Sequence, residues 1–317
     1  MKSFILVICF LQLLVGKSIA APSFSTLATV TTTASSDVDE NEKKAREDFR
    51  EMQLESWILN RGSPDERSGI NLDKWNASTS MDDPEERGDY LEGDILFEDD
   101  PSSPKSAIMG ENYRWPNAKV YVKFSNVFTP SDLAVIRSGM KEIEKHTCVK
   151  FFDYNPGVAK DYIDISSNHT GCFSSVGRRG GSQRLNLQRP RCINKKTVSH
   201  EFIHALGFFH EQSRGDRDKY VQILYKNIKN PNIHNFERRD SNNLGSTYDP
   251  ESIMHYSRYA FAKNPKLPTI NFKPPYQDFN KKVITTKNRK MSSMDIQKIN
   301  RLYKCEKSGT NGKKIRF

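Results

Sequence analysis

Long hydrophobic runs are missing from almost all of this 317-residue sequence. After residue 20, no apolar stretch approaches the roughly 18 residues that a membrane-spanning helix needs. The one apolar run, from Phe4 to Val15, follows Lys2 and precedes small residues up to Ala20, which is typical of a secretory signal. We therefore expect residues 1–20 to be a signal peptide. The processed chain is expected to be soluble, secreted and extracellular, without stable membrane insertion.

Cysteine is also scarce, with five residues in the whole chain. No two of them have C-x-x-C spacing, which argues against a cysteine-based metal site. Cys9 falls in the expected signal peptide, so an even set remains that can pair fully in an oxidising compartment. These four are Cys148, Cys172, Cys192 and Cys305, and three pairings are open to them.

Two Asn-x-Ser/Thr sequons agree with a secreted chain. They begin at Asn76 and Asn168. We expect both asparagines at the surface, as candidate glycosylation sites.

Charge is distributed unevenly, although the total is +10. Residues 21–105 contain 9 Lys and Arg against 21 Asp and Glu, a balance of −12, whereas residues 106–317 contain 38 against 18, a balance of +20. This split predicts that residues 21–105, the acidic leader, lie against a basic domain until they are removed. An equal alternative is a disordered leader that is only hydrated. With so few apolar groups, its residues 60–105 should fold only against a partner.

The basic residues after position 105 are scattered, and their short clusters are Arg178-Arg179, Lys195-Lys196 and Lys313-Lys314. Such clusters are more often solvated surface than binding sites. We therefore expect no nucleic-acid partner, and binding of a heparin-like polyanion stays a minor hypothesis.

Periodicity after residue 105 mixes strands and helices. Strand-like segments occupy residues 119–124, 148–152 and 162–166. Thr129 followed by Pro130 is a helix start, and apolar residues then recur at helical spacing. Further helices are predicted from about Lys196 to Leu206 and after Ser292. No internal repeat is present, and the roughly 200 residues from Ser106 to Cys305 suffice for one sizeable core.

The most informative motif is His200-Glu201-x-x-His204, extended by Gly207 and His210. Residues four apart share a helix face, so His200 and His204 can bind one metal ion, with Glu201 beside it. Gly207 can take the positive φ that ends a helix and turns the chain back toward that ion. Ordinary helix histidines are the alternative for the first five residues. The two further residues at fixed offsets argue strongly against that alternative.

The segment from His200 to Tyr220, followed by Ser252-Ile-Met-His-Tyr256, resembles the astacin family of metzincin metallopeptidases. The similarity runs from about Ser106 to Cys305. It implies a secreted zinc endopeptidase with an α+β catalytic domain of two lobes around an active-site cleft. The first lobe would hold a sheet and the active-site helix, and the second would be irregular with a terminal helix. Residues 306–317 would then form a basic tail, without appended domains.

The resemblance also implies roles for individual residues. One zinc ion per subunit would bind His200, His204 and His210. Glu201 would act as general base toward the zinc-activated water. Tyr256 would be the fifth zinc ligand and would stabilise the oxyanion, and Met254 would lie beneath the metal. The implied disulfides join Cys148 to Cys305 and Cys172 to Cys192.

Latency follows from the same resemblance, because Leu91-Glu92-Gly93-Asp94 resembles the Phe-x-Gly-Asp motif of astacin zymogens, with Leu in place of Phe. Asp94 would replace the catalytic water on zinc, which makes the acidic leader a propeptide and an inhibitor. A trypsin-like protease would cut between Lys105 and Ser106. The new amino group of Ser106 would then contact Glu211, a structural residue.

Substrate preference is implied only by Arg289, which lies near the position of an arginine that shapes the S1′ pocket in some astacins. We expect a preference for Asp or Glu at P1′ of protein or peptide substrates. The main alternative is a catalytically silent astacin-like protein that recognises a glycan or a protein surface. The complete ligand set and Glu201 argue against it.

Overall fold

The computed structural model describes residues 66–96, 110–239, 241–282, 289–308 and 314–316, all within one compact unit, Gln53–Phe317. The expected signal peptide, the start of the acidic leader and the Lys105–Ser106 junction lie outside these residues. None of the helices in the described ranges is both long and apolar enough to cross a membrane.

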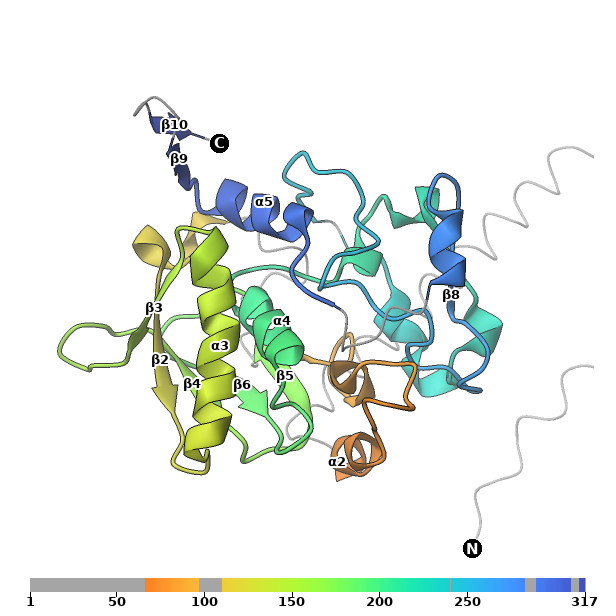
Figure 1. Cartoon of the computed structure of the whole chain (residues 1–317), viewed down its shortest axis with the longest axis horizontal. Coiled ribbons are helices and arrows are strands. Elements are labelled where there is room, and N and C mark those ends of the chain that lie inside the picture. The colour runs from red at the N-terminus through yellow and green to blue at the C-terminus, as the bar shows by residue number, and fades with distance from the viewer. Residues whose placement is uncertain (1–65, 97–109, 240, 283–288, 309–313, 317) are drawn as a thin grey trace, which may run out of the picture. The chain divides into compact units, whose positions relative to one another are not determined.

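A six-stranded sheet forms the framework of the first lobe, in the order β1-β5-β6-β4-β2-β3 (Figure 1). All neighbouring strands are parallel except β5 and β6, which are antiparallel. The strands are β1 (Ile95–Leu96), β2 (Lys119–Phe124), β3 (Lys150–Asp153), β4 (Tyr162–Ser166), β5 (Cys172–Ser175) and β6 (Ser182–Leu187). The predicted strands at 119–124 and 162–166 are thereby confirmed, and the one predicted at 148–152 is shifted by two residues at its start.

Three helices pack around this sheet. Helices α3 (Pro130–His146) and α4 (Lys195–Ala205) lie side by side across it, and α5 (Ser293–Leu302) lies at one end (Figure 1). Thr129 caps α3 by accepting a hydrogen bond from the backbone amide of Asp132, whose side chain accepts one from Thr129 in return. The same capping box opens α5 at Ser292. Ile136, Ile143, Val198 and Ile299 meet the strands in the main hydrophobic core.

The second lobe has little regular structure. A short antiparallel pair, β7 (Val221–Ile223) and β8 (Ile270–Phe272), frames a separate core that contains Phe236, Tyr248 and Tyr256. Other short elements occur along the whole described chain. They are the 3-10 helices η2 (Glu111–Tyr113), η3 (Pro116–Ala118), η4 (Glu211–Ser213), η5 (Arg217–Lys219), η6 (Tyr225–Asn227), η7 (Asn230–Phe236) and η8 (Gln277–Lys281), and the strands β9 (Glu306–Ser308) and β10 (Lys314–Arg316). Two separate cores agree with the predicted α+β fold of two lobes.

The described part of the acidic leader is folded against the domain. It comprises α2 (Glu66–Asp73), η1 (Pro84–Arg87) and β1, and Leu72 and Trp75 belong to the main core. Strand β1 pairs with β5, so that Ile95 lies opposite Ser174. The hydrated-leader alternative is therefore wrong for residues 66–96, which order against a partner as their composition requires.

Two disulfides link distant parts of the domain. Cys148 is bonded to Cys305 and Cys172 to Cys192, with sequence separations of 157 and 20. This is the connectivity that the family resemblance implies. The first bond ties the start of β3 to the end of α5, and the second ties β5 to the segment before α4.

The longer disulfide loop should restrict the unfolded chain more. By the loop-entropy relation, replacing Cys148 and Cys305 with serine is expected to lower the free energy of unfolding by about 5 kcal/mol, against about 3 kcal/mol for the Cys172 and Cys192 pair. Urea unfolding of the full chain measures both losses. A larger loss for the shorter loop would contradict the loop-entropy account.

Candidate active site

Helix α4 carries the first half of the site. Asn194 caps it by accepting a hydrogen bond from the backbone amide of Thr197 at 2.9 Å, and every residue from Lys196 to Ala205 is buried. His200 and His204 lie one turn apart, with their ring centroids 4.7 Å from each other. Glu201 is fully buried beside them. The predicted helix therefore presents both imidazoles to one interior point.

The third imidazole arrives after a turn at Gly207. This residue has φ 112°, in the left-handed region that favours glycine, and its amide donates to the carbonyl of His204 at 2.8 Å. The chain then reverses, and His210 comes to rest with its ring centroid 4.7 Å from that of His204. Gly207 therefore lies at the turn that brings His210 toward the other two imidazoles.

Each imidazole is held in one tautomer by an acceptor behind it. Nδ1 of His200 donates to the carbonyl of Ile253 at 2.8 Å, and Nδ1 of His204 donates to the carbonyl of Phe208 at 2.6 Å. Nδ1 of His210 lies 2.7 Å from a carboxylate oxygen of Glu92. These partners place the protons on Nδ1. The three Nε2 lone pairs then face the centre of the site, as in metal-binding histidines.

Asp94 of the acidic leader completes the cluster. Its carboxylate oxygens lie 3.1 Å from Nε2 of His200, 3.5 Å from that of His204 and 3.3 Å from that of His210. All four candidate ligand atoms lie within 4.8 Å of one another. Ligands placed about 2.0–2.2 Å from a tetrahedral zinc ion stand roughly 3.3–3.6 Å apart. The cluster therefore has the spacing of a zinc site.

Two unsatisfied atoms support the same conclusion. Oδ1 of Asp94 and Nε2 of His204 are buried and lack hydrogen-bond partners among the described residues, which is costly unless a cation binds them.

The pKa values of two imidazoles also fit a site for positive charge. Burial lowers the pKa of His200 to about 3, so its ring is neutral. Burial also lowers the pKa of His210, but Asp94 and Glu92 outweigh it and raise that pKa to about 9. A bound metal ion would supply the positive charge that these two carboxylates favour.

The surroundings of Glu201 suit a carboxyl group that accepts and donates a proton. Both its carboxylate oxygens are buried and lack hydrogen-bond partners in the described part of the chain. Burial, and then the charge of Asp94, raise the pKa of Glu201 well above its usual value, while Lys196 acts in the opposite direction. A carboxyl group without fixed partners beside a metal cluster is free to exchange a proton with a bound molecule.

Tyr256, from the core of the second lobe, packs against the site, and Met254 belongs to the main core. The ring of Tyr256 packs on His210 at 4.7 Å between centroids, but its hydroxyl donates to the carbonyl of Glu92 at 2.7 Å. The hydroxyl is therefore bound to the acidic leader in this structure. Met254 is buried, and its carbonyl accepts from the amide of Glu211 at 2.9 Å.

Glu211 is a buried anchor between the lobes. Its carboxylate contacts Nη1 of Arg214 at 2.8 Å, Nζ of Lys298 at 2.5 Å and the backbone amide of Asp249 at 2.8 Å. These contacts fit a structural role. The predicted contact with Ser106 lies outside the described residues.

The other predicted residues lie at the surface or under the leader. Asn76 and Asn168 are exposed, as the sequons require. Arg289 is buried and contacts the backbone carbonyl of Tyr256 at 3.4 Å. Two of the basic clusters named from sequence are only partly available to bind a polyanion, because Arg178 pairs with Asp161 at 2.5 Å and Lys196 is buried.

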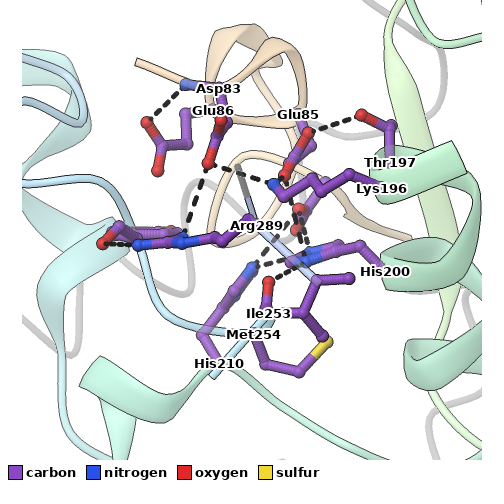
Figure 2. A network of polar contacts seen from close by, with 12 residues as sticks. Asp83, Glu85, Glu86, Lys196, Thr197, His200, His210, Ile253, Met254 and Arg289 are labelled. Atoms are coloured by element: carbon purple, nitrogen blue, oxygen red, sulfur yellow. Dashed lines mark hydrogen bonds and ion pairs between the residues drawn. The ribbon is translucent and has the colours of Figure 1, made fainter. Parts of the chain in front are cut away.

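A second group of charges, not predicted from sequence, lies beside the metal cluster. Figure 2 shows Asp83 and Glu85 of the leader directed toward Lys196, and Asp83 also toward Arg289. Burial lowers the pKa of Lys196 to about 8, against the opposing influence of Asp83. The signals available in the sequence were the acidic run from Asp82 to Glu86 and a lysine four residues before His200. Glu92, whose carboxylate contacts His210, was identified from sequence only as a member of the segment Leu91-Glu92-Gly93-Asp94.

Comparison with known proteins agrees with this geometry. The family model described as astacin, a family of peptidases, matches residues 107–304. The chain is 38% identical over 232 residues to zinc metalloproteinase nas-4 of Caenorhabditis elegans, covering 69% of this chain and 70% of that protein. It is 37% identical over 222 residues to low choriolytic enzyme of Oryzias latipes, covering 68% and 79%. The solved structure of high choriolytic enzyme 1, a hatching enzyme zinc-protease of the same fish, matches with a TM-score of 0.55 at 36% identity, covering 61% of this chain and 93% of that one.

Three imidazoles point to one centre, and Glu201 beside them has no hydrogen-bond partner among the described residues. On an α+β fold, this arrangement defines a metal-dependent peptidase. The match over residues 107–304 makes the class specific. The chain belongs to the astacin family of zinc metalloendopeptidases.

Glu86 makes the docking of the acidic leader sensitive to pH. Burial, then the charges of Asp83 and Asp82, raise the pKa of Glu86 from 4.5 to about 8, while hydrogen bonds from Ser257 act in the opposite direction. A raised pKa gives stability that is full below about 4.5 and is lost as pH rises through about 8. We expect the free energy of unfolding of the full chain to fall between pH 5 and 9, and to fall less in Glu86→Gln.

Urea unfolding at pH 5, 7 and 9 measures this difference. Glu251→Gln, which changes an exposed glutamate, is the matched control and should keep the wild-type pH dependence. Identical pH profiles for wild type and Glu86→Gln would contradict the assignment.

Proposed function

We propose that the protein is a secreted endopeptidase that is made as a latent precursor, with residues 21–105 as propeptide and residues 106–305 as the catalytic domain. The observation that carries the proposal is Asp94, whose carboxylate oxygens lie 3.1–3.5 Å from the Nε2 atoms of the three imidazoles, as a fourth ligand would. A leader carboxylate at that point excludes a water molecule and a substrate carbonyl together. Secretion rests on the signal-like first 20 residues.

His200, His204 and His210 would hold one zinc ion, which when bound lowers the pKa of a water molecule and polarises a peptide carbonyl. Glu201 takes the proton from the attacking water and passes it to the leaving amine, because its carboxylate has no other fixed partner among the described residues. Tyr256, once released from Glu92, would turn its hydroxyl toward the site as fifth ligand and donate to the oxyanion. Met254 supports the imidazoles from below.

Several contacts besides Asp94 hold the leader in the site. Glu92 links His210 to Arg239, and the hydroxyl of Tyr256 is bound to the Glu92 carbonyl. Burial opposes the ionisation of Glu92, but Arg239 and His210 outweigh it and lower its pKa to about 2. Strand β1 also fills the free edge of β5, where an extended substrate would otherwise pair. Activation therefore requires the whole segment to leave.

The finer parts of the proposal concern partners. A trypsin-like protease would cut between Lys105 and Ser106, and the new terminus at Ser106 would then approach Glu211. Substrates would be proteins or peptides with Asp or Glu at P1′, read by Arg289. Heparin-like polyanions are weaker candidates, since Arg178 and Lys196 are already paired.

Glu201→Gln should abolish most of the activity without loss of zinc. Removing the general base is expected to lower kcat/KM about 10²- to 10⁴-fold, measured as casein cleavage by the chain after removal of residues 21–105. Zinc content of the purified variant should stay near one per chain. Glu251→Gln is the control and should cleave like wild type. A zinc chelator should stop the wild-type enzyme, and added zinc should restore it.

No cleavage by the wild type after verified removal of the leader would contradict the enzyme. That result would favour the catalytically silent astacin-like binding protein. Full activity of Glu201→Gln would instead contradict the role of this carboxylate.

Asp94→Ala should weaken latency in the uncut chain. Loss of one buried charged ligand is expected to raise cleavage of a small fluorogenic peptide at least about tenfold over the uncut wild type. Asp73→Asn changes an exposed carboxylate of the leader and should leave the uncut chain as inactive as wild type. Equal activities of uncut Asp94→Ala and wild type would show that Asp94 does not block the site.

A further inference from the structure

Two buried cations flank the metal cluster on the side of the acidic leader. Lys196 lies in the first turn of α4, four residues before His200 and therefore above it on the same helix face. Arg289 comes from the segment that precedes α5. Their exposed fractions are both 6%. Buried charges of this kind are stable only when they are paired.

One carboxylate oxygen of the leader bridges both cations. Oδ2 of Asp83 lies 3.0 Å from Nζ of Lys196 and 3.5 Å from Nη1 of Arg289 (Figure 2). The arrangement is a two-cation receptor already filled by a carboxylate. Since Asp83 belongs to a segment that leaves on activation, the receptor is available to another carboxylate afterwards.

A second leader carboxylate lies between Lys196 and the zinc ligands. One oxygen of Glu85 contacts Nζ of Lys196 and lies 3.9 Å from Nδ1 of His200, and the other accepts from the hydroxyl of Thr197 at 3.0 Å. The ammonium group of Lys196 is thus close to the cluster where a peptide bond would be cut. An acidic side chain next to the scissile bond would be within its reach.

The surroundings leave room for such a side chain. A cavity of about 470 Å³ adjoins the two cations and is lined by Ile253 and Met291 of the domain, with Trp75 and Ala77 of the leader forming another part of its wall. Departure of the leader widens this cavity and exposes both cations to solvent. The burial that depresses the pKa of Lys196 is then relieved, so its charge is kept.

We infer that Lys196 is a specificity-determining residue, which together with Arg289 binds the side-chain carboxylate of the substrate residue after the cut. The leader carboxylates of Asp83 and Glu85 occupy this subsite in the latent form. The inference rests on the proposed peptidase function and adds a second cation to the arginine expected from sequence. It accounts for a buried lysine one turn from a metal ligand.

The test compares peptides that differ only in Asp or Asn at P1′, cleaved by the full chain after limited trypsin activation. Lys196→Gln should lower the ratio of kcat/KM for the Asp peptide to that for the Asn peptide about tenfold, the size expected for one lost charge-assisted hydrogen bond. Lys196→Arg should keep a ratio near that of wild type. Lys195→Gln is the matched control, because its exposed ammonium pairs with Glu142 at 2.6 Å.

The outcomes separate this inference from the peptidase function. A wild type that cleaves neither peptide contradicts the peptidase. An active Lys196→Gln enzyme with an unchanged Asp to Asn ratio overturns the inference alone, and leaves Lys196 as a latch for the leader. A lowered ratio in Lys195→Gln would overturn it too, by assigning the effect to general positive charge.

A second measurement needs no variant of the enzyme. A peptide with the sequence of residues 81–88 should inhibit the activated wild type at least about tenfold more strongly than the same peptide with Asp83→Asn and Glu85→Gln. Equal inhibition by the two peptides would overturn the inference even if Lys196→Gln failed to fold.

Discussion

The structure depends on a point where four lone-pair-bearing groups meet in the interior. His200, His204 and His210 direct their Nε2 atoms toward one point, and Asp94 adds a carboxylate at 3.1–3.5 Å. In a buried environment such a set is repulsive unless a cation holds it together. The cap at Asn194, the turn at Gly207 and the acceptors behind each imidazole all serve to keep these atoms aimed at one point.

The acidic leader adds negative charge beside the buried cations that it covers. Asp94 contacts the three imidazoles, Glu92 pairs with Arg239, and Asp83 pairs with Lys196 and Arg289. The opposite charges of leader and domain are therefore not a diffuse attraction. A few buried pairs join the two. Residues 66–96 fold because the domain supplies both the apolar contacts and the countercharges that they lack alone.

Much of the first lobe was predictable because its signals are local. The capping boxes at Thr129 and Ser292 and the apolar spacing after them define α3 and α5, and alternation defines the strand from Lys119 to Phe124. The two strands β5 and β6 were missed. Both bury small or polar residues, such as Ser174 and Asn186, so their sequence lacks the alternation of a half-buried strand.

The histidine cluster was predictable for the same local reason, since its three members lie close together in sequence. The charges around them were not. Lys196 and Asp83 are 113 residues apart in sequence, and Arg289 is 206 residues from Asp83. A buried ion pair leaves no periodic trace, because each partner looks like an ordinary surface charge until the fold brings them together. The hydroxyl of Tyr256 is a similar case, as its partner depends on whether the leader is present.

The described contacts of the leader end at Leu96, whereas the expected cut lies after Lys105. Hydrolysis there would sever the covalent tether without touching any of the bonds that hold residues 72–96 in place. A tether of this length keeps the effective concentration of an attached segment near the millimolar range. Once it is cut, the same segment becomes a separate ligand, and its occupancy follows mass action. Activity of the cut chain would then depend on its concentration and appear on dilution.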